Sequence, residues 1–189
     1  MIALVAGLIL FIAPHLFRET GARARLLRRL PSESAYKGLF TLLVASGLIL
    51  IAWGKSNAEF TMIWQPPFQY QHFSFWLMAP ACVLLMAGNL PQSLVKRELR
   101  NPMLLGVVLW SMAHLWTNGD LASVTLFGAL GLWALVKYIS LWRLQPIEGE
   151  FKAGWLLWDA LALLGGFLLF ATLVLWHGEL FGVGLNVDY

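Results

Sequence analysis

The stretch from Arg100 to Asp120, RNPMLLGVVLWSMAHLWTNGD, decides how the rest of the chain is interpreted. It opens with a basic residue and an Asn-Pro pair typical of a helix start, and it closes with an Asn-Gly-Asp turn. The residues between are almost uncharged, and His114 lies among them. Because an ionisable side chain inside a membrane is costly, such a histidine is a functional hypothesis by default.

Composition indicates a polytopic membrane protein. Of the 189 residues, 59% are hydrophobic and 12% are charged, with a mean hydropathy of +0.71. A soluble domain carries about 25% charged residues. The single cysteine, Cys82, excludes an internal disulfide and a cysteine-based zinc site. No P-loop, dinucleotide fingerprint or hydrolase motif is present, and no nucleic-acid partner is expected. We expect one all-α domain over residues 1–189.

Six apolar stretches predict six transmembrane helices. They cover residues 2–17, 35–53, 72–90, 102–116, 121–142 and 154–176. The first lacks the basic region that precedes a signal peptide's apolar core, so we expect it to be retained as a span. Ser32 is a candidate N-cap of the second span. Pro80 is expected to kink the third span, and Pro66-Pro67 to keep the preceding loop non-helical.

The distribution of basic residues predicts the orientation of these spans. Twelve of the thirteen Lys and Arg fall in or beside the three loops that join spans one to two, three to four and five to six. Only Lys55 falls on the opposite side. The positive-inside rule therefore predicts that both termini lie outside and that the three basic loops are cytoplasmic.

The fourth span is too short for an ordinary membrane helix. About fifteen residues cover ~22 Å, against a hydrocarbon core of ~30 Å. Either the span is one arm of a re-entrant hairpin, or the bilayer thins, or the turn at 118–120 is submerged and faces a cavity open to the outer side. His114 would lie ~16 Å above Met103, near the bilayer midplane.

Polar residues of the fourth span follow a helical stripe. Ser111, His114 and Asn118 are spaced i, i+3, i+7, which places them on one face of a helix. Asp120, beyond the turn, is expected to cap the fifth span. These four residues are the candidate polar lining of the cavity.

Asp159 is a further polar candidate, a few residues into the sixth span. It is either protonated, paired with a basic residue such as Lys152 or Arg143, or part of a proton route. The simpler alternative is an interfacial carboxylate near a helix start, where the helix dipole favours negative charge.

Four histidines are candidate ligands: His15, His72, His114 and His177. His72 and His177 fall at span ends and are most simply interfacial, whereas His15 and His114 make either interhelical hydrogen bonds or bonds to a metal. Two imidazoles without a nearby thiolate or carboxylate suit haem b better than zinc or copper. On straight helices, His15 and His114 differ in height by about 11 Å, so this argument alone leaves His72 and His177 open as partners of His114.

Three segments resemble the NnrU family of bacterial membrane proteins, which are encoded with denitrification genes. They are APHLFRETGARARLLRRLPSESAYKGLF, HFSFWLMAPACVLLMAGNLP and RNPMLLGVVLWSMAHLWTNGDLASVTLFGALGLWALV. Together they cover roughly residues 10–140. The last is the most specific, because Trp-x-x-Ala-His followed by Asn-Gly-Asp is not generic hydrophobicity. The resemblance implies a multi-pass protein of the bacterial inner membrane.

NnrU proteins are in turn similar to the haem-dependent zeta-carotene isomerase of plants and cyanobacteria. That similarity implies haem b ligated by His15 and His114, with His72 matching a third histidine. The isomerase has a cysteine where this chain has Ser111, so no thiolate ligand switch is expected here. Family members usually carry Arg-His-Pro where this chain has Arg100-Asn101-Pro102, so that histidine is also missing.

The sequence therefore predicts a haem b membrane protein linked to nitrite and nitric oxide metabolism, with the lipid bilayer and denitrification or respiratory membrane components as partners. If it is an enzyme, it is a haem-dependent isomerase or oxidoreductase acting on a hydrophobic substrate. The alternative is a haem-free accessory factor, assembly factor or small transporter for denitrification enzymes. A lipid-modifying enzyme is less favoured, because no cofactor-binding loop is visible.

Overall fold

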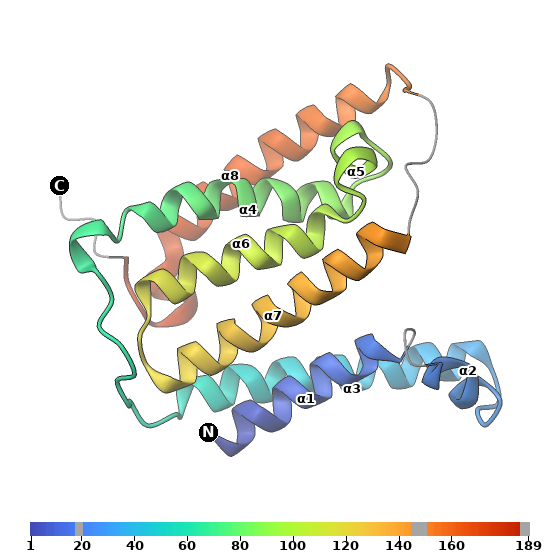
Figure 1. The fold of residues 1–189 in the computed structure, drawn as a ribbon, viewed down its shortest axis with the longest axis horizontal. Coiled ribbons are helices and arrows are strands. Elements are labelled where there is room, and N and C mark those ends of the chain that lie inside the picture. The colour runs from blue at the N-terminus through green and yellow to red at the C-terminus, as the bar shows by residue number, and fades with distance from the viewer. Residues whose placement is uncertain (18–20, 145–150, 186–189) are drawn as a thin grey trace. The chain divides into compact units, whose positions relative to one another are not determined.

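The computed structural model describes residues 1–17, 21–144 and 151–185, and these residues are folded almost entirely into helices (Figure 1). The described elements are α1 (Ile2–Leu16), α2 (Ala22–Leu27), α3 (Glu33–Ser56), η1 (Phe68–Tyr70), α4 (Phe73–Asn89), α5 (Leu94–Leu99), α6 (Pro102–Thr117), α7 (Leu121–Leu144) and α8 (Trp155–Phe181). The all-α prediction is confirmed. Arg18 and residues 145–150, which belong to two of the predicted cytoplasmic loops, lie outside the described residues.

Each of the six predicted spans corresponds to a helix: α1, α3, α4, α6, α7 and α8. Among the described residues, α3, α7 and α8 are long and apolar enough to cross a membrane. The helices α1, α4 and α6 are apolar but have only 15, 17 and 16 residues. Large apolar side chains cover outward faces, with Ile49 69% and Leu168 61% exposed. Such surfaces are expected against lipid, and they fit a membrane protein.

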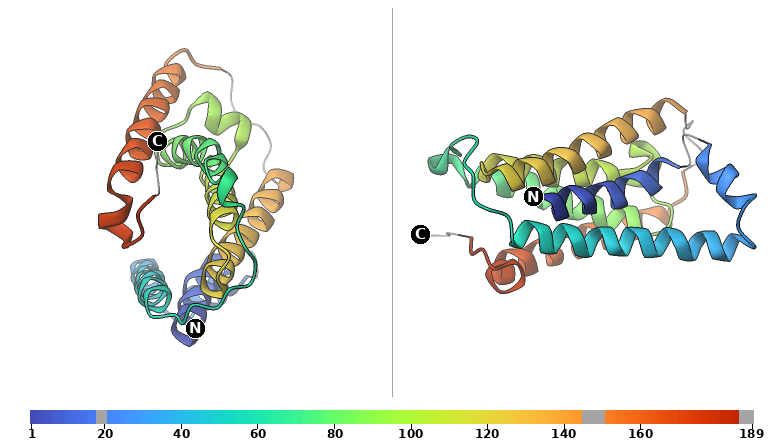
Figure 2. Two further views of the ribbon diagram at one scale, coloured as in Figure 1. Left: turned by 90° about the vertical axis from the view of Figure 1, so that its left-hand side faces the viewer. Right: turned by 90° about the horizontal axis from the view of Figure 1, so that it is seen from below.

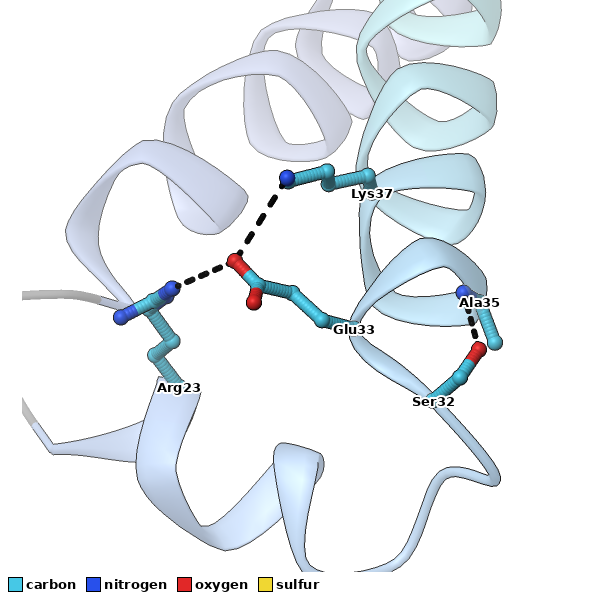
Figure 3. A network of polar contacts seen from close by, with 5 residues as sticks. All are labelled: Arg23, Ser32, Glu33, Ala35 and Lys37. Carbon is cyan, nitrogen blue, oxygen red and sulfur yellow. Dashed lines mark hydrogen bonds and ion pairs between the residues drawn. The ribbon is translucent and has the colours of Figure 1, made fainter.

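The corner between α2 and α3 follows the predicted capping. Ser32 has extended backbone geometry, and its Oγ accepts a hydrogen bond of 3.1 Å from the backbone N–H of Ala35 (Figure 3). Glu33 lies between Arg23 and Lys37, at 3.4 and 3.6 Å. These exposed ion pairs contribute little to stability, so the cap is the main local signal for the start of α3.

Pro102, Pro66 and Pro67 behave as expected of their positions, whereas the kink expected at Pro80 stays a prediction. Pro102 is the first residue of α6, where its missing N–H costs nothing, and the Asn101 side chain accepts the N–H of Leu104 at 3.2 Å. Pro66 and Pro67 precede η1 and lie in non-helical chain. Pro80 lies inside α4, which is assigned as one helix on both sides of it.

By the density of its contacts the chain divides into two compact units, each described by itself. The first comprises residues 1–66 and 118–130, and the second residues 67–117 and 131–189. In the first unit, α1 and α3 lie side by side (Figure 1). Their backbones touch at glycines: a Cβ on Gly7 would lie 2.8 Å from the carbonyl oxygen of Gly47. Small residues allow this close approach, as in many membrane helix pairs.

Residues 61–64 of the first unit bind the start of α7. The carbonyl oxygen of Gly119 accepts the N–H groups of Ile63 and Trp64, at 2.8 and 3.2 Å, and Thr61 accepts the N–H of Leu121 at 2.8 Å. A Cβ on Gly119 would overlap the carbonyl group of Trp64. The predicted Asn-Gly turn therefore has a second function, because only glycine allows the two backbones to pair.

In the second unit, α4 packs against both α6 and α8 and lies between them (Figures 1 and 2). The contacts again use glycines. A Cβ on Gly106 of α6 would lie 3.0 Å from the carbonyl oxygen of Ala81, and one on Gly166 of α8 would lie 2.7 Å from the backbone nitrogen of Val83. Close backbone packing gives the three helices a dense interface without bulky side chains.

Candidate functional site

His114 lies in the last turn of α6, and its ring is held by its own helix. Its Nδ1 lies 2.8 Å from the carbonyl oxygen of Trp110, and the two rings are 5.0 Å apart. A carbonyl oxygen only accepts hydrogen bonds, so Nδ1 carries the proton and Nε2 carries the lone pair. The residue is part-buried. This hydrogen bond therefore defines the tautomer of the His114 ring.

Ser111 lies one turn before His114 and is completely enclosed. Its residue exposure is 1%, and its Oγ has no hydrogen-bond partner within the described chain. Gly131 of α7 makes room for it, because a Cβ there would lie 3.1 Å from this oxygen. Asn118 follows the last residue of α6, so the expected helical stripe extends through Ser111 and His114 only.

His177 belongs to the same unit as His114 and lies within electrostatic range of it. The backbone departs from helical geometry at Trp176 (φ −114°, ψ 17°), just before this histidine. The Nδ1 of His177 lies 2.6 Å from the carbonyl oxygen of Val183. His177 therefore also has its proton on Nδ1.

An aromatic pocket of about 410 Å³ opens beside the start of α4. It is lined by Gln69, Tyr70, His72, Phe73, Trp76 and Trp116. The indole N–H of Trp116 donates to the carbonyl oxygen of Tyr70 at 3.0 Å, and the rings of Phe73 and Trp116 are 5.5 Å apart. His72 is exposed at this pocket, as expected of an interfacial residue.

His15 belongs to the first unit and repeats the geometry of His114. Its Nδ1 lies 2.6 Å from the carbonyl oxygen of Phe11, four residues earlier in α1. The ring contacts Phe11 and Phe40, with centroids 4.7 and 5.2 Å away. The proton is again on Nδ1 and the lone pair on Nε2. The two residues that the family resemblance implies as ligands thus share one hydrogen-bonding arrangement.

These two imidazoles have the donor chemistry that haem iron requires. Metal-ligating histidines usually donate their second ring N–H to a carbonyl or carboxylate, which fixes the ring and raises its basicity. Phe11 and Trp110 supply that carbonyl for His15 and His114. Within the described residues, no group of three or more His, Cys, Asp or Glu gathers as a site for a bare metal ion.

Asp120 caps α7 and forms an ion pair with Lys55. Its Oδ1 accepts the N–H of Ser123 at 3.0 Å and lies 2.9 Å from Nζ of Lys55. Burial by itself would raise the pKa of Asp120, but the hydrogen bonds from Ser123 and Lys55 outweigh it and hold the pKa below its usual value. Asp120 is therefore a stable carboxylate, and the predicted N-cap is confirmed.

Asp159 joins α8 to α5. Its two carboxylate oxygens accept the backbone N–H groups of Leu94 and Val95, at 3.0 and 3.2 Å. The sequence suggested Lys152 or Arg143 as partners, but the contacts seen here are with peptide groups at the start of a short helix. Asp159 is therefore paired with neither Lys152 nor Arg143 in these contacts, and it has a structural role between α8 and α5.

Two features of these sites were missed by sequence reasoning. The first is the pairing of Lys55 with Asp120. The sequence does contain one signal for it, because Lys55 is the single basic residue on the predicted outer side and so is the one Lys or Arg there that could pair with Asp120. The aromatic pocket had no comparable signal, because Tyr70 and Trp116 are 46 residues apart and meet only through the packing of α4 on α6.

Comparison with known proteins identifies one family. A family model described as NnrU protein matches residues 3–185, nearly the whole chain. No curated protein and no solved structure matches the chain.

Proposed function

Because the chain belongs to the NnrU family, we propose that it is a six-span protein of the bacterial inner membrane that binds one haem b and acts in redox metabolism linked to nitrite and nitric oxide. In the part of the chain that the structure describes, three long apolar helices and three shorter ones support the membrane assignment. The excess of Lys and Arg in alternate loops supports an arrangement with both termini outside.

One observation carries the haem proposal: the bond from Nδ1–H of His114 to the carbonyl oxygen of Trp110. It leaves the lone pair on Nε2, in a helix whose other residues are mostly apolar. His15 has the same arrangement in α1, and the family resemblance supplies it as the second ligand. These residues would hold the iron, and Phe11 and Trp110 would orient the rings.

A bound haem would supply one-electron redox chemistry. The chain's own contribution is to fix both imidazoles and to keep the surroundings apolar. Ser111, one turn before His114, has a buried hydroxyl that would be able to donate or accept a hydrogen bond. If the protein is an enzyme, a hydrophobic substrate would enter from the bilayer, and the reaction would be an isomerisation or an oxidoreduction.

The absorption spectrum of the purified protein tests this proposal. Protein from haem-replete cells, in detergent, should show a Soret band and sharp α and β bands on reduction. His114→Ala should abolish them, whereas His72→Ala, which alters an exposed histidine, should retain them. Circular dichroism of both variants checks that the helices persist. A colourless wild-type protein would overturn the haem proposal.

The orientation is tested separately, by fusing a reporter of periplasmic or cytoplasmic location after residue 189. The reporter is expected to be active in the periplasm, because the C-terminus is proposed to lie outside. Reporter activity in the cytoplasm would contradict the proposed orientation, with both termini outside, but would leave the spectral test untouched.

A haem-free accessory factor, assembly factor or small transporter is the second candidate. It fits the same hydrogen bonds, because the Nδ1–H groups of His15 and His114 are both satisfied within their own helices without any ligand. In that case the histidines would serve packing or proton transfer. Unchanged denitrification in cells carrying His114→Ala, together with a colourless protein, would support this candidate.

A further inference from the structure

The segment that joins α4 to α6 carries three cations, Lys96, Arg97 and Arg100, and they differ in what they contact. Nζ of Lys96 donates to the carbonyl oxygens of Gly88 and Leu90, at 3.1 and 2.6 Å. It therefore closes the C-terminal end of α4, where such carbonyls lack helical partners. Lys96 has a structural role, which leaves the two arginines to be explained.

Arg100 has an unusual backbone conformation. Its φ is 59° and its ψ is −50°, and it is the only non-glycine residue with positive φ in the described chain. The N–H of Asn101 bonds the carbonyl oxygen of Leu99, which closes a classic γ-turn around Arg100. This turn is rare and strained, and glycine would adopt a positive φ with less cost. Strain at a residue with a functional side chain is typical of binding sites.

The guanidinium of Arg100 is held in place but is not saturated. It stacks over the ring of Trp142, with Cζ 4.3 Å from the ring centroid. Its Nε is buried and has no hydrogen-bond partner in the described part of the chain, and the same is true of Nε of Arg97. Among the described residues, the ion pair of the Arg97 guanidinium is with Glu98, at 3.8 Å, which is longer than a hydrogen bond. Two arginines three residues apart thus each have a buried donor without an acceptor.

A planar guanidinium with unused donors is suited to a phosphate group, which accepts two parallel N–H bonds. Arg97 and Arg100 lie between the end of α4 and the start of α6, two apolar helices, and Arg100 is two residues before α6 begins. The two arginines therefore belong at the membrane surface. Their segment is also one of the basic loops that the charge distribution places in the cytoplasm, where anionic lipids concentrate. We propose that Arg97 and Arg100, with Trp142, form a binding site for the phosphate of an anionic phospholipid.

Thermal unfolding of the full-length protein in detergent, with added lipid, tests this site. Phosphatidylglycerol should raise the Tm more than phosphatidylcholine does, with saturation. Arg97→Gln and Arg100→Gln should weaken the apparent affinity for phosphatidylglycerol by about tenfold or more. Arg28→Gln removes one exposed charge from another basic loop, and it should respond like the wild type. An equal response of all variants would overturn the proposal.

Arg100→Gly separates the site from simple loss of stability. It removes the guanidinium and also relieves the γ-turn, so in phosphatidylcholine its Tm should equal or exceed that of the wild type. It should nevertheless lose the response to phosphatidylglycerol. A retained response would overturn the proposal. Inorganic phosphate at matched ionic strength is the last arm: an Arg100-dependent rise in Tm with phosphate alone would show a site for soluble anions and overturn the assignment to lipid.

Discussion

Nζ of Lys55 lies 2.9 Å from Oδ1 of Asp120, 65 residues further along the chain. The contact joins the end of α3 to the start of α7 within the first unit. The side chain of Asp120 is only 11% exposed, and that of Lys55 is 33% exposed. A pair this enclosed matters more than a surface ion pair, because removing one partner leaves a poorly solvated charge.

Lys55→Met should lower the free energy of unfolding by about 1–3 kcal/mol, since Asp120 would lose its charged partner. Lys37→Met is the matched control. Its side chain is 72% exposed and lies 3.6 Å from Glu33, so its loss should cost less than about 1 kcal/mol. Thermal unfolding in detergent measures both. Equal effects of the two variants would contradict a special role for the Lys55–Asp120 pair.

The same pair predicts a dependence of stability on pH. The pKa of Asp120 is lower in the folded protein than in the unfolded chain, where it is about 3.9. Its contribution is therefore complete above about pH 4 and is lost as the pH falls through the folded pKa. The difference in Tm between the wild type and Asp120→Asn should be constant from about pH 5 to 8 and narrow below about pH 4. A Tm difference that widens as the pH falls would contradict a lowered pKa of Asp120 in the folded protein.

Two glycines of α3 provide a test of close helix packing. A Cβ on Gly54 would overlap the backbone of Leu4 in α1, whereas one on Gly38 would have nothing within 4 Å. Gly54→Ala should therefore destabilise the protein by about 1–3 kcal/mol. Gly38→Ala should be neutral or stabilising by up to about 1 kcal/mol, because alanine favours helix. Similar Tm values for the two variants would show that α1 and α3 do not pack this closely.

Asp159→Ala should loosen the start of α5. The variant removes the acceptor of the Leu94 and Val95 N–H groups, which are 65 and 64 residues away in sequence. Hydrogen exchange at these two amides should speed up by about tenfold or more, while amides in the middle of α8 stay protected. Exchange that is unchanged at Leu94 and Val95 would exclude this contact.

The partner of His114 can be identified by comparing two histidine variants. If His15 is the second haem ligand, His15→Ala should convert the reduced spectrum to that of a five-coordinate haem or abolish haem binding. His177→Ala should leave a six-coordinate spectrum, although His177 lies within electrostatic range of His114. The reverse pattern would assign His177, which the height argument from the sequence also allowed.

Much of the fold was predictable because its signals are local. Six apolar stretches became six helices, Ser32 and Asp120 cap α3 and α7, and Pro102 starts α6. These features depend on residues within one helical turn. The prediction for Asn118 was less accurate, because α6 ends one residue before it and the stripe stops at His114.

Partners distant in the sequence were not predictable in this way. The amides that bind Asp159, the lysine that binds Asp120 and the ring that stacks on Arg100 all come from other helices. Periodicity reports which face of a helix is apolar, but it does not specify which neighbouring helix covers that face. Glycines such as Gly106 and Gly166 select those neighbours, because only they let two backbones approach, and their spacing gave no prior indication of the pairing.

By itself, the sequence determined that this is a helical membrane protein of the NnrU type, with histidines inside its apolar helices. The apolar stretches and the basic loops are properties of consecutive residues, so the order of residues is sufficient to locate them. Only the tertiary structure decided how each histidine ring is held, which carboxylate meets Lys55, and that Arg100 occupies a strained turn over Trp142. Those features depend on hydrogen bonds and ring contacts a few ångströms long, which arise only once the helices are packed.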